Sequence, residues 1–309
     1  MSNRWWEIVI KCEPILEESI FWRIEEFGGS GTATEVVLDK KQDFEFEFED
    51  RQTIIRTYIP EIKAQLLDLS TLSSYLKKDA ELFEASLPEV KWRLIDEEDW
   101  ASSWKQHWKP MKIGDRFIIC PAWESLPEES SRLVIRLDPG AAFGTGTHPT
   151  TQLCLESLEM RLYDNAESKI IADIGCGSGI LSLGSILLGA KKAYAVDTDS
   201  LATKTCRSNC KLNEIDTDRV TVFDGSIEKL IETDEIFDGI ICNILAETIV
   251  KLFPQFNQIT HEQSWAILSG ILLTQADLIA DIVEQHGWTV AALWKRKDWC
   301  CFNIRRSEY

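Results

Sequence analysis

The sequence predicts an α/β protein with a doubly wound, mostly parallel sheet that contains one antiparallel strand, preceded by a small α+β domain. From about residue 170 onward, short apolar runs alternate with amphipathic stretches of helical spacing. Three glycines, Gly175, Gly177 and Gly179, lie between one of these apolar runs and the helical pattern that follows it. The length of 309 residues suggests two domains.

The first part of the chain mixes predicted strands and helices. Residues 5–11, 32–38, 44–48 and 52–59 read as strands, and residues 14–27 have amphipathic helical spacing. We expect a further helix from Pro60 to about residue 69 and a helical segment over residues 72–84. Together these elements predict an α+β domain over residues 1–93, without a cluster of catalytic side chains. The acidic and aromatic segment 44–48 fits a binding face and a solvated face equally well.

Residues 94–116 are predicted to form a linker between the two domains. Trp100, Trp104 and Trp108 are spaced at i, i+4 and i+8, which places them in one helical stripe that we expect to pack between domains. The second domain is predicted over residues 117–309, and its first strand over residues 116–120. An irregular loop rich in glycine and proline follows residue 137 and leads into a helix near Thr150. From its residues alone, this loop is as consistent with a plain connection as with a cover over a ligand.

The strands of the second domain end in residues that suit ligand binding. Gly175 follows the apolar strand 170–174, Asp197 ends strand 191–197, Asp224 ends strand 220–224, and Asn243 follows strand 237–242. Ligands of doubly wound sheets bind outside the carboxyl ends of the strands, so these residues predict a common site. A fifth strand over 264–268 and a closing pair over 288–294 and 299–304 complete the predicted sheet, with helices over 180–188, 200–213, 246–256 and 274–285.

Two nucleotide-type motifs compete for the glycine turn. The dinucleotide fingerprint G-x-G-x-x-G requires a glycine where this chain has Ile180. The observed pattern is instead Asp173-x-Gly175-x-Gly177-x-Gly179, and it resembles the first motif of the class I S-adenosylmethionine-dependent methyltransferases. An acid placed like Asp197, at the end of the next strand, can accept both ribose hydroxyls of an adenosine. The alternative is an apolar strand followed by a flexible turn and a surface aspartate.

Further segments extend this resemblance over residues 95–309. FGTGTHPTT at 143–151, DIGCGSGIL at 173–181 and CNILA at 242–246 resemble the bacterial methyltransferases of the eleventh large-subunit ribosomal protein. The resemblance implies a Rossmann-like methyltransferase domain, S-adenosylmethionine as cofactor, and methylation, up to trimethylation, of lysine side chains and of the N-terminal α-amine of that ribosomal protein. It also implies that the first domain grips the substrate and that the Trp-bearing linker is a hinge.

The resemblance implies the roles of individual residues as well. Asn243 is the expected catalytic residue, because its side-chain oxygen or nearby carbonyls can accept N–H bonds from an incoming amine. The segment 243–246 lacks the prolines and the aromatic residue of related amide methyltransferases, which favours an alkyl amine as acceptor. The loop 143–147 is expected to close over the cofactor. The predicted cofactor-binding residues are Phe143, Thr145, Gly146, Thr151, Asp173, Gly175, Gly177, Gly179, Asp197, Asp224 and Asn243.

Composition limits the remaining possibilities. A formal charge of −18 disfavours direct nucleic-acid binding and suits a basic protein partner, such as a large-subunit ribosomal protein. The N-terminus lacks a signal-peptide core, no apolar run is long enough to span a membrane, and the nine cysteines have no CxxC spacing, so we expect a cytoplasmic protein with reduced thiols and no metal. Three other functions stay open: methylation of a non-ribosomal lysine substrate, a nicotinamide-dependent oxidoreductase, and a non-catalytic binding module.

Overall fold

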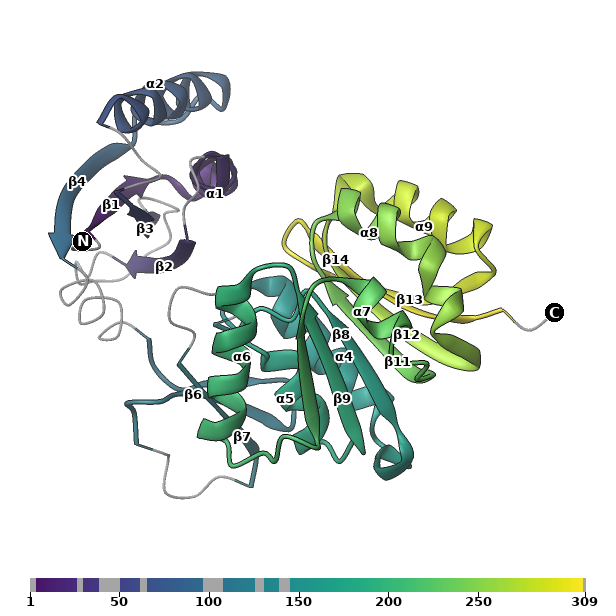
Figure 1. Ribbon diagram of the computed structural model, residues 1–309. Helices are drawn as coiled ribbons and strands as arrows, with labels where there is room; N and C mark the ends of the chain where they lie inside the picture. Colours follow the sequence, from purple (N-terminus) through teal and green to yellow (C-terminus); the bar gives the residue numbers. More distant parts are fainter. Residues whose placement is uncertain are drawn as a thin grey trace, which may run out of the picture. The chain divides into compact units, whose positions relative to one another are not determined.

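The computed structural model describes residues 4–26, 30–38, 51–61, 66–96, 108–125, 131–138 and 145–307. The chain forms two compact units, Met1–His107 and Trp108–Tyr309 (Figure 1). The domain boundary that we expect after residue 93 would fall within a strand of the first unit, β4 (Glu89–Asp96). Trp100 and Trp104 of the predicted linker stripe lie outside the described residues.

In its described residues, the first unit contains an antiparallel sheet and two helices. Its strand order is β2 (Ser30–Leu38), β3 (Arg51–Pro60), β1 (Arg4–Cys12) and β4. A 3-10 turn at Pro14–Leu16 leads into α1 (Glu17–Glu26), which contacts α2 (Leu66–Leu82). Because side chains alternate between the two faces of a strand, one face of β1 joins both helices in a buried core that includes Ile8, Ile10, Ile20, Leu72 and Leu76.

Three features of the first unit differ from the prediction. Pro60 ends β3, where it pairs with Trp5, so the prediction of a helix start at Pro60 is wrong. The two predicted helical segments are one continuous helix, α2, and the Ser70 carbonyl accepts a hydrogen bond from Ser74 Oγ (3.1 Å) in its interior. β4 was not predicted, although Val90, Trp92 and Leu94 alternate with charged residues, the pattern of a strand. The predicted strand 44–48 lies outside the described residues.

The main sheet of the second unit confirms the predicted fold class. Its order is β10 (Val220–Asp224), β9 (Lys192–Asp197), β8 (Ile170–Ile174), β11 (Phe237–Asn243), β12 (Thr260–Leu272), β14 (Trp299–Arg306) and β13 (Trp288–Arg296). The first five strands in this order are parallel, and β14 is antiparallel to both of its neighbours. β14 is therefore the single antiparallel strand of this sheet.

Helices cover both faces of this sheet (Figure 1). One face packs against α7 (Ile227–Ile231), α8 (Ala246–Leu252) and α9 (Ala276–Gln285), and Ala172 and Ile174 of β8 belong to that buried cluster. The intervening residue, Asp173, points to the opposite face. That face carries α4 (Pro149–Arg161), α5 (Ile180–Leu187) and α6 (Ser200–Leu212). Short 3-10 turns lie at Ala166–Ser168, Phe253–Gln258 and Leu273–Gln275.

A small second sheet packs on α4 and α5. It comprises β5 (Met111–Ile113), β6 (Phe117–Pro121) and β7 (Leu133–Leu137), of which only β6 was predicted. A Cβ at Gly184 of α5 would lie 2.8 Å from Leu155 Cδ2 and 3.5 Å from Phe117 Cζ, so this glycine lets helix and sheet approach closely. None of the helices in the described ranges has the length and apolarity needed to cross a bilayer.

Candidate active site

The turn between β8 and α5 carries the three alternate glycines. Gly175, Gly177 and Gly179 have φ angles of 77°, 53° and 83°, in the left-handed region that residues with a Cβ rarely adopt. The N–H groups of Gly175 and Cys176 both donate to the Val196 carbonyl, at 2.9 and 3.0 Å, which fixes the turn to the neighbouring strand β9. The glycines are therefore required by the backbone of the turn itself.

Asp197 ends β9 beside this turn and is partly exposed. Its Oδ2 accepts a hydrogen bond from the Gly177 N–H at 2.9 Å, and its Oδ1 accepts one from the Asp199 N–H at 2.9 Å. A carboxylate offers about four lone-pair sites, so each oxygen retains the capacity to accept one more donor. Asp197 is thus oriented by the glycine turn and can still bind two hydroxyl groups of a ligand.

Asp173 is the acid that precedes the turn, and it is fully buried. Its Oδ2 accepts hydrogen bonds from the backbone N–H of Ser182 (3.0 Å) and from Ser182 Oγ (2.6 Å). Its Oδ1 has no hydrogen-bond partner among the described residues. Burial raises the pKa of Asp173 to about 6, although the bonds from Ser182 oppose this shift. The unpartnered oxygen is a position where an N–H donor or a cation of a ligand would be stabilised.

Asp224 lies beside Asp197 in the register of the two parallel strands. Its carboxylate accepts a hydrogen bond from Thr203 Oγ1 and forms an ion pair with Arg207 Nη2 at 3.6 Å. The Thr203 hydrogen bond, assisted by the Arg207 charge, lowers the pKa of Asp224. The side chain is 61% exposed, so it combines these contacts to α6 with free access for a ligand donor.

Asn243 ends β11 and is partly buried, opposite Ser269 of β12. The next residue, Ile244, is clamped between two glycines. A Cβ at Gly175 would lie 2.2 Å from Ile244 Cγ2, and a Cβ at Gly270 would lie 2.3 Å from the Ile244 carbonyl oxygen. Gly270 also has a positive φ of 80°. The segment after Asn243 is therefore packed directly against the glycine turn, a contact that sequence reasoning missed.

The described end of the predicted cofactor loop lies against β6 and α5. Gly146 has a φ of 84°, and its Cβ would lie 3.1 Å from Ile119 Cγ1 and 3.2 Å from Ile180 Cδ1, at the first residue of α5. The hydroxyls of Thr145 and Thr147 are hydrogen-bonded at 2.8 Å. Phe143 lies outside the described residues.

His148 and Thr151 connect this loop to α4. His148 is the N-cap of the helix, and its Nδ1 accepts a hydrogen bond from the Thr150 N–H. Burial, followed by the charge of Lys297, lowers the pKa of His148 to about 4, so the ring is neutral at pH 7. Thr151, in the first turn of α4, is buried, and its Oγ1 has no partner among the described residues. Like Asp173, it provides a polar atom that a ligand could satisfy.

The structure brings the predicted residues of the sheet together at one edge. The paired positions Ile174↔Val196, Cys242↔Ile174 and Asp224↔Asp197 show that β8, β9, β10 and β11 end level with one another. Gly175, Asp197, Asp224 and Asn243 therefore lie at the ends of four adjacent strands. The glycine motif and the strand-end acids were readable from sequence. Gly270 lies in no motif, and Ile244, although it lies within the segment CNILA, was not predicted to contact the glycine turn.

Two cysteines near this edge, Cys154 and Cys242, are not activated nucleophiles. Burial raises the pKa of Cys154 and of Cys242, and the charge of the nearby Asp173 raises both further. Each thiol is therefore held in its neutral form. Within the described ranges, no group of three or more His, Cys, Asp or Glu side chains is placed to hold a metal ion.

A comparison with models of protein families identifies the family of this chain. The family model described as Ribosomal protein L11 methyltransferase (PrmA) matches residues 4–307. The chain belongs to this family. The match includes residues 4–94, where the motifs gave no resemblance, so both structural units are part of the family's architecture.

Members of the L11 methyltransferase family resemble the chain over its full length. It is 44% identical to "Ribosomal protein L11 methyltransferase" of Thermosynechococcus vestitus over 308 residues, covering 99% of this chain and 98% of that protein. It is 47% identical to the protein of the same name from a Cyanothece strain over 309 residues, covering 99% of this chain and 100% of that protein. A crystal structure of a ribosomal protein L11 methylase from Lactobacillus delbrueckii subsp. bulgaricus superposes with a TM-score of 0.59 at 31% identity, covering 65% of this chain and 100% of that chain.

Proposed function

We propose that this protein transfers methyl groups from S-adenosylmethionine to lysine side-chain amines of ribosomal protein L11. The observation that carries the proposal is the family match over residues 4–307. It is supported by the names of the full-length relatives and by the alignment of the predicted site residues at one edge of the sheet. The dinucleotide alternative is disfavoured because Ile180, the residue that replaces the required third glycine, begins α5.

The residues at the site fit an adenosyl amino-acid cofactor. Asp197 has acceptor capacity for the two ribose hydroxyls while the glycine turn orients it. The unpartnered Oδ1 of buried Asp173 suits the cationic amino-acid part, which is the group that the glycine turn approaches in class I methyltransferases. When bound, the cofactor supplies a methyl group on a sulfonium, so the activation and the leaving group come from the cofactor itself.

The protein's task is then to position the acceptor amine and exclude water. In our proposal Asn243, at the end of β11, accepts hydrogen bonds from the N–H groups of the lysine amine. These bonds orient the amine so that the lone pair of its nitrogen points at the methyl group. A well-oriented pair of reactants can lower the barrier by about 7–11 kcal/mol. The packing of Ile244 against Gly175 fixes the distance between the acceptor segment and the cofactor turn.

Only a neutral amine is nucleophilic, and a lysine in water has a pKa of about 10.4. Transfer from water into the site disfavours the charged ammonium and lowers this pKa. In our proposal this desolvation supplies the neutral amine, and no dedicated general base is required. The buried thiols described above are themselves protonated and do not contribute one.

Finer parts of the proposal concern the substrate. We infer that lysines receive up to three methyl groups and that the N-terminal α-amine of L11 is also an acceptor. We further propose that the first unit grips L11, that the segment carrying Trp100, Trp104 and Trp108 is the hinge between binding and transfer, and that the reaction takes place in the cytoplasm. The net charge of −18 supports a basic protein partner in preference to nucleic acid.

Intact mass spectrometry of ribosomal proteins tests the proposal. Proteins from cells with and without the gene for this chain are compared, and the purified protein is then incubated with labelled S-adenosylmethionine and the unmodified ribosomal proteins. We expect L11 to gain mass in whole methyl increments only when the chain is present. Label on another protein instead would identify a non-ribosomal substrate, and label on none would contradict the proposal.

A further inference from the structure

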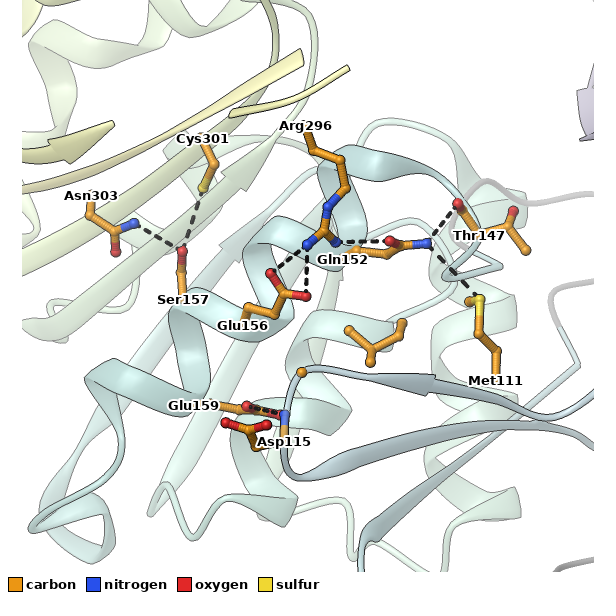
Figure 2. A network of polar contacts seen from close by, with 12 residues as sticks. Met111, Asp115, Thr147, Gln152, Glu156, Ser157, Glu159, Arg296, Cys301 and Asn303 are labelled. Carbon is orange, nitrogen blue, oxygen red and sulfur yellow. Dashed lines mark hydrogen bonds and ion pairs between the residues drawn. The ribbon is translucent and has the colours of Figure 1, made fainter. Parts of the chain in front are cut away.

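We propose that Arg296, on the closing hairpin of the sheet, is a positioning residue for the cofactor loop, and that it acts through Gln152. The inference rests on the proposed function, because it assigns residues to the binding of that function's cofactor. Its basis is a network of polar contacts along α4, drawn in Figure 2.

Three polar residues of α4, Gln152, Glu156 and Glu159, form a row at helical spacing. Together they contact the cofactor loop, the closing hairpin and the small sheet of the second unit. Glu159 accepts hydrogen bonds from the Asp115 and Arg116 N–H groups, both at 2.9 Å, and so fixes the β5–β6 turn. Glu156 accepts two hydrogen bonds from Arg296 Nη2, at 3.1 and 3.0 Å. The cofactor loop, the closing hairpin and the small sheet are therefore all held by polar contacts to α4.

Gln152 links Arg296 to the loop. Its Oε1 accepts a hydrogen bond from Arg296 Nη1 at 2.9 Å, and its Nε2 donates one to the Thr147 carbonyl at 3.0 Å (Figure 2). The orientation of the amide is unambiguous, because a guanidinium only donates and a carbonyl only accepts. Arg296 therefore holds Gln152 in the one orientation in which its NH₂ group faces Thr147.

The same hairpin supports the loop at a second point. Trp299, which pairs with Arg296 across β13 and β14, contacts His148 edge to face with ring centroids 4.8 Å apart. His148 is in turn the N-cap of α4 and the neighbour of Thr147. Two successive loop residues are thus held by two paired residues of the hairpin, one through a hydrogen-bond relay and one through a ring contact.

This support acts on the residues predicted to bind the cofactor. Thr147 is hydrogen-bonded to Thr145, Gly146 packs against Ile180 at the start of α5, and Thr151 stands in the first turn of α4. Loss of the Thr147 anchor would leave the loop free to move away from α5, and binding would then have to restore its order. We therefore expect Arg296 and Gln152 to influence cofactor affinity although neither is proposed to touch the cofactor.

The test measures S-adenosylhomocysteine affinity by calorimetry and melting temperature for three variants of the full-length protein. Gln152→Glu keeps an acceptor for Arg296 but replaces the donor to Thr147 with a second acceptor. Arg296→Met removes the guanidinium and keeps much of the apolar stem. Arg305→Met is the matched control, since Arg305 is an exposed arginine of the same hairpin. We also measure kcat and the KM for S-adenosylmethionine.

Loss of one net hydrogen bond predicts a Kd about 3–10-fold higher for Gln152→Glu and for Arg296→Met, with KM rising more than kcat falls. Arg305→Met should bind like wild type, and Arg296→Lys should rescue binding only in part because an ammonium lacks the planar fork. The double variant should bind S-adenosylhomocysteine no more weakly than the single variant with the lower affinity, because both substitutions break the same relay.

Wild-type affinity in both Gln152→Glu and Arg296→Met would overturn this inference alone, and so would a fall in melting temperature without a change in affinity. A wild-type protein that fails to bind S-adenosylhomocysteine would overturn the proposed function, and this inference with it.

Discussion

The side chain of Ile244 occupies the space above Gly175: a Cβ on that glycine would lie 2.2 Å from Ile244 Cγ2. Ile244 follows the proposed acceptor residue Asn243, and Gly175 opens the proposed cofactor turn. On its other side, the Ile244 backbone lies against Gly270 of β12. In our proposal, the segments that bind the two substrates of the methyl transfer are therefore in direct van der Waals contact, and the geometry between them depends on one β-branched side chain.

Changing the branching of Ile244 should therefore change catalysis more than stability. Ile244→Leu keeps the side-chain volume but removes Cγ2, whereas Ile244→Val keeps Cγ2 and loses Cδ1. A displacement of the acceptor segment by a fraction of an ångström predicts kcat lowered by about 10–100-fold in the leucine variant. The valine variant should turn over almost like wild type, and both should lose only about 1 kcal/mol of stability. Equal turnover in the two variants would show that Cγ2 has no positioning role.

Gly270→Ala should disturb the same segment from the other side. The new Cβ would lie 2.3 Å from the Ile244 carbonyl oxygen, at a φ of 80° that alanine adopts with strain. The strain alone costs about 1–2 kcal/mol, and the displaced Ile244 backbone should also lower kcat. Gly189→Ala is the control, because Gly189 has a φ of 106° but its nearest contact would be Ala166 Cβ at 3.4 Å. Thermal melts should fall in both variants, while turnover should fall only at position 270.

Asp173 should make stability depend on pH in an identifiable window. Its pKa is raised from 3.8 to about 6 by burial, so the folded protein favours the protonated acid. Its contribution to stability is therefore fully present below pH 4 and is lost as the pH rises through about 6. The shift corresponds to about 3 kcal/mol. Asp173→Asn is neutral throughout.

Urea unfolding of wild type and Asp173→Asn at pH 4, 5, 6 and 7 measures this contribution. The difference in the free energy of unfolding between variant and wild type should increase with pH by up to about 3 kcal/mol, and level off above pH 7. Taking the difference between the two proteins removes the pH dependence of stability that the other carboxylates contribute to both. A difference that stays constant across this range would show that burial does not raise the pKa of Asp173 in the folded protein.

Replacing Asn243 should separate catalysis from cofactor binding. Asn243→Ala removes the proposed acceptor for the lysine N–H groups, so kcat should fall by about 10–100-fold, and by a larger factor than the affinity for S-adenosylhomocysteine. Asn243→Asp adds a negative charge beside the amine, which raises the amine pKa. The rise of kcat with pH should then move to higher pH than in wild type. Steady-state kinetics from pH 7 to 10 checks both expectations, and an Asn243→Ala enzyme with normal kcat would exclude the role.

The sequence predicted the site residues best where their position follows from the topology of a parallel sheet. Asp197, Asp224 and Asn243 end three strands of the parallel part of the sheet, and the carboxyl ends of parallel strands meet at one edge. The contact between Gly175 and Ile244 could not be predicted in this way, because it depends on the register of β8 against β11 and on the rotamer of one apolar side chain. The Arg296–Gln152 relay likewise joins residues that share no motif.

In the first unit, local patterns conflicted with tertiary structure. Pro60 suggested a helix start, but the pairing of β3 with β1 extends as far as Pro60 and decides the outcome. The charged residues of β4 obscured its apolar alternation, although Val90, Trp92 and Leu94 gave a readable strand signal. These errors left the proposed site untouched, since all of its predicted residues belong to the second unit.

The most direct test of this account is isothermal titration of S-adenosylhomocysteine into the wild-type protein and into Asp197→Asn. Asp197 is oriented by the N–H groups of Gly177 and Asp199, and the amide would turn an NH₂ group toward one of these donors. We predict one binding site per chain in wild type and an affinity about 10–100-fold lower in the variant, the loss expected for hydrogen bonds to a charged group. Absence of binding heat in wild type, or equal affinity in the two proteins, would contradict the placement of the cofactor at this edge of the sheet.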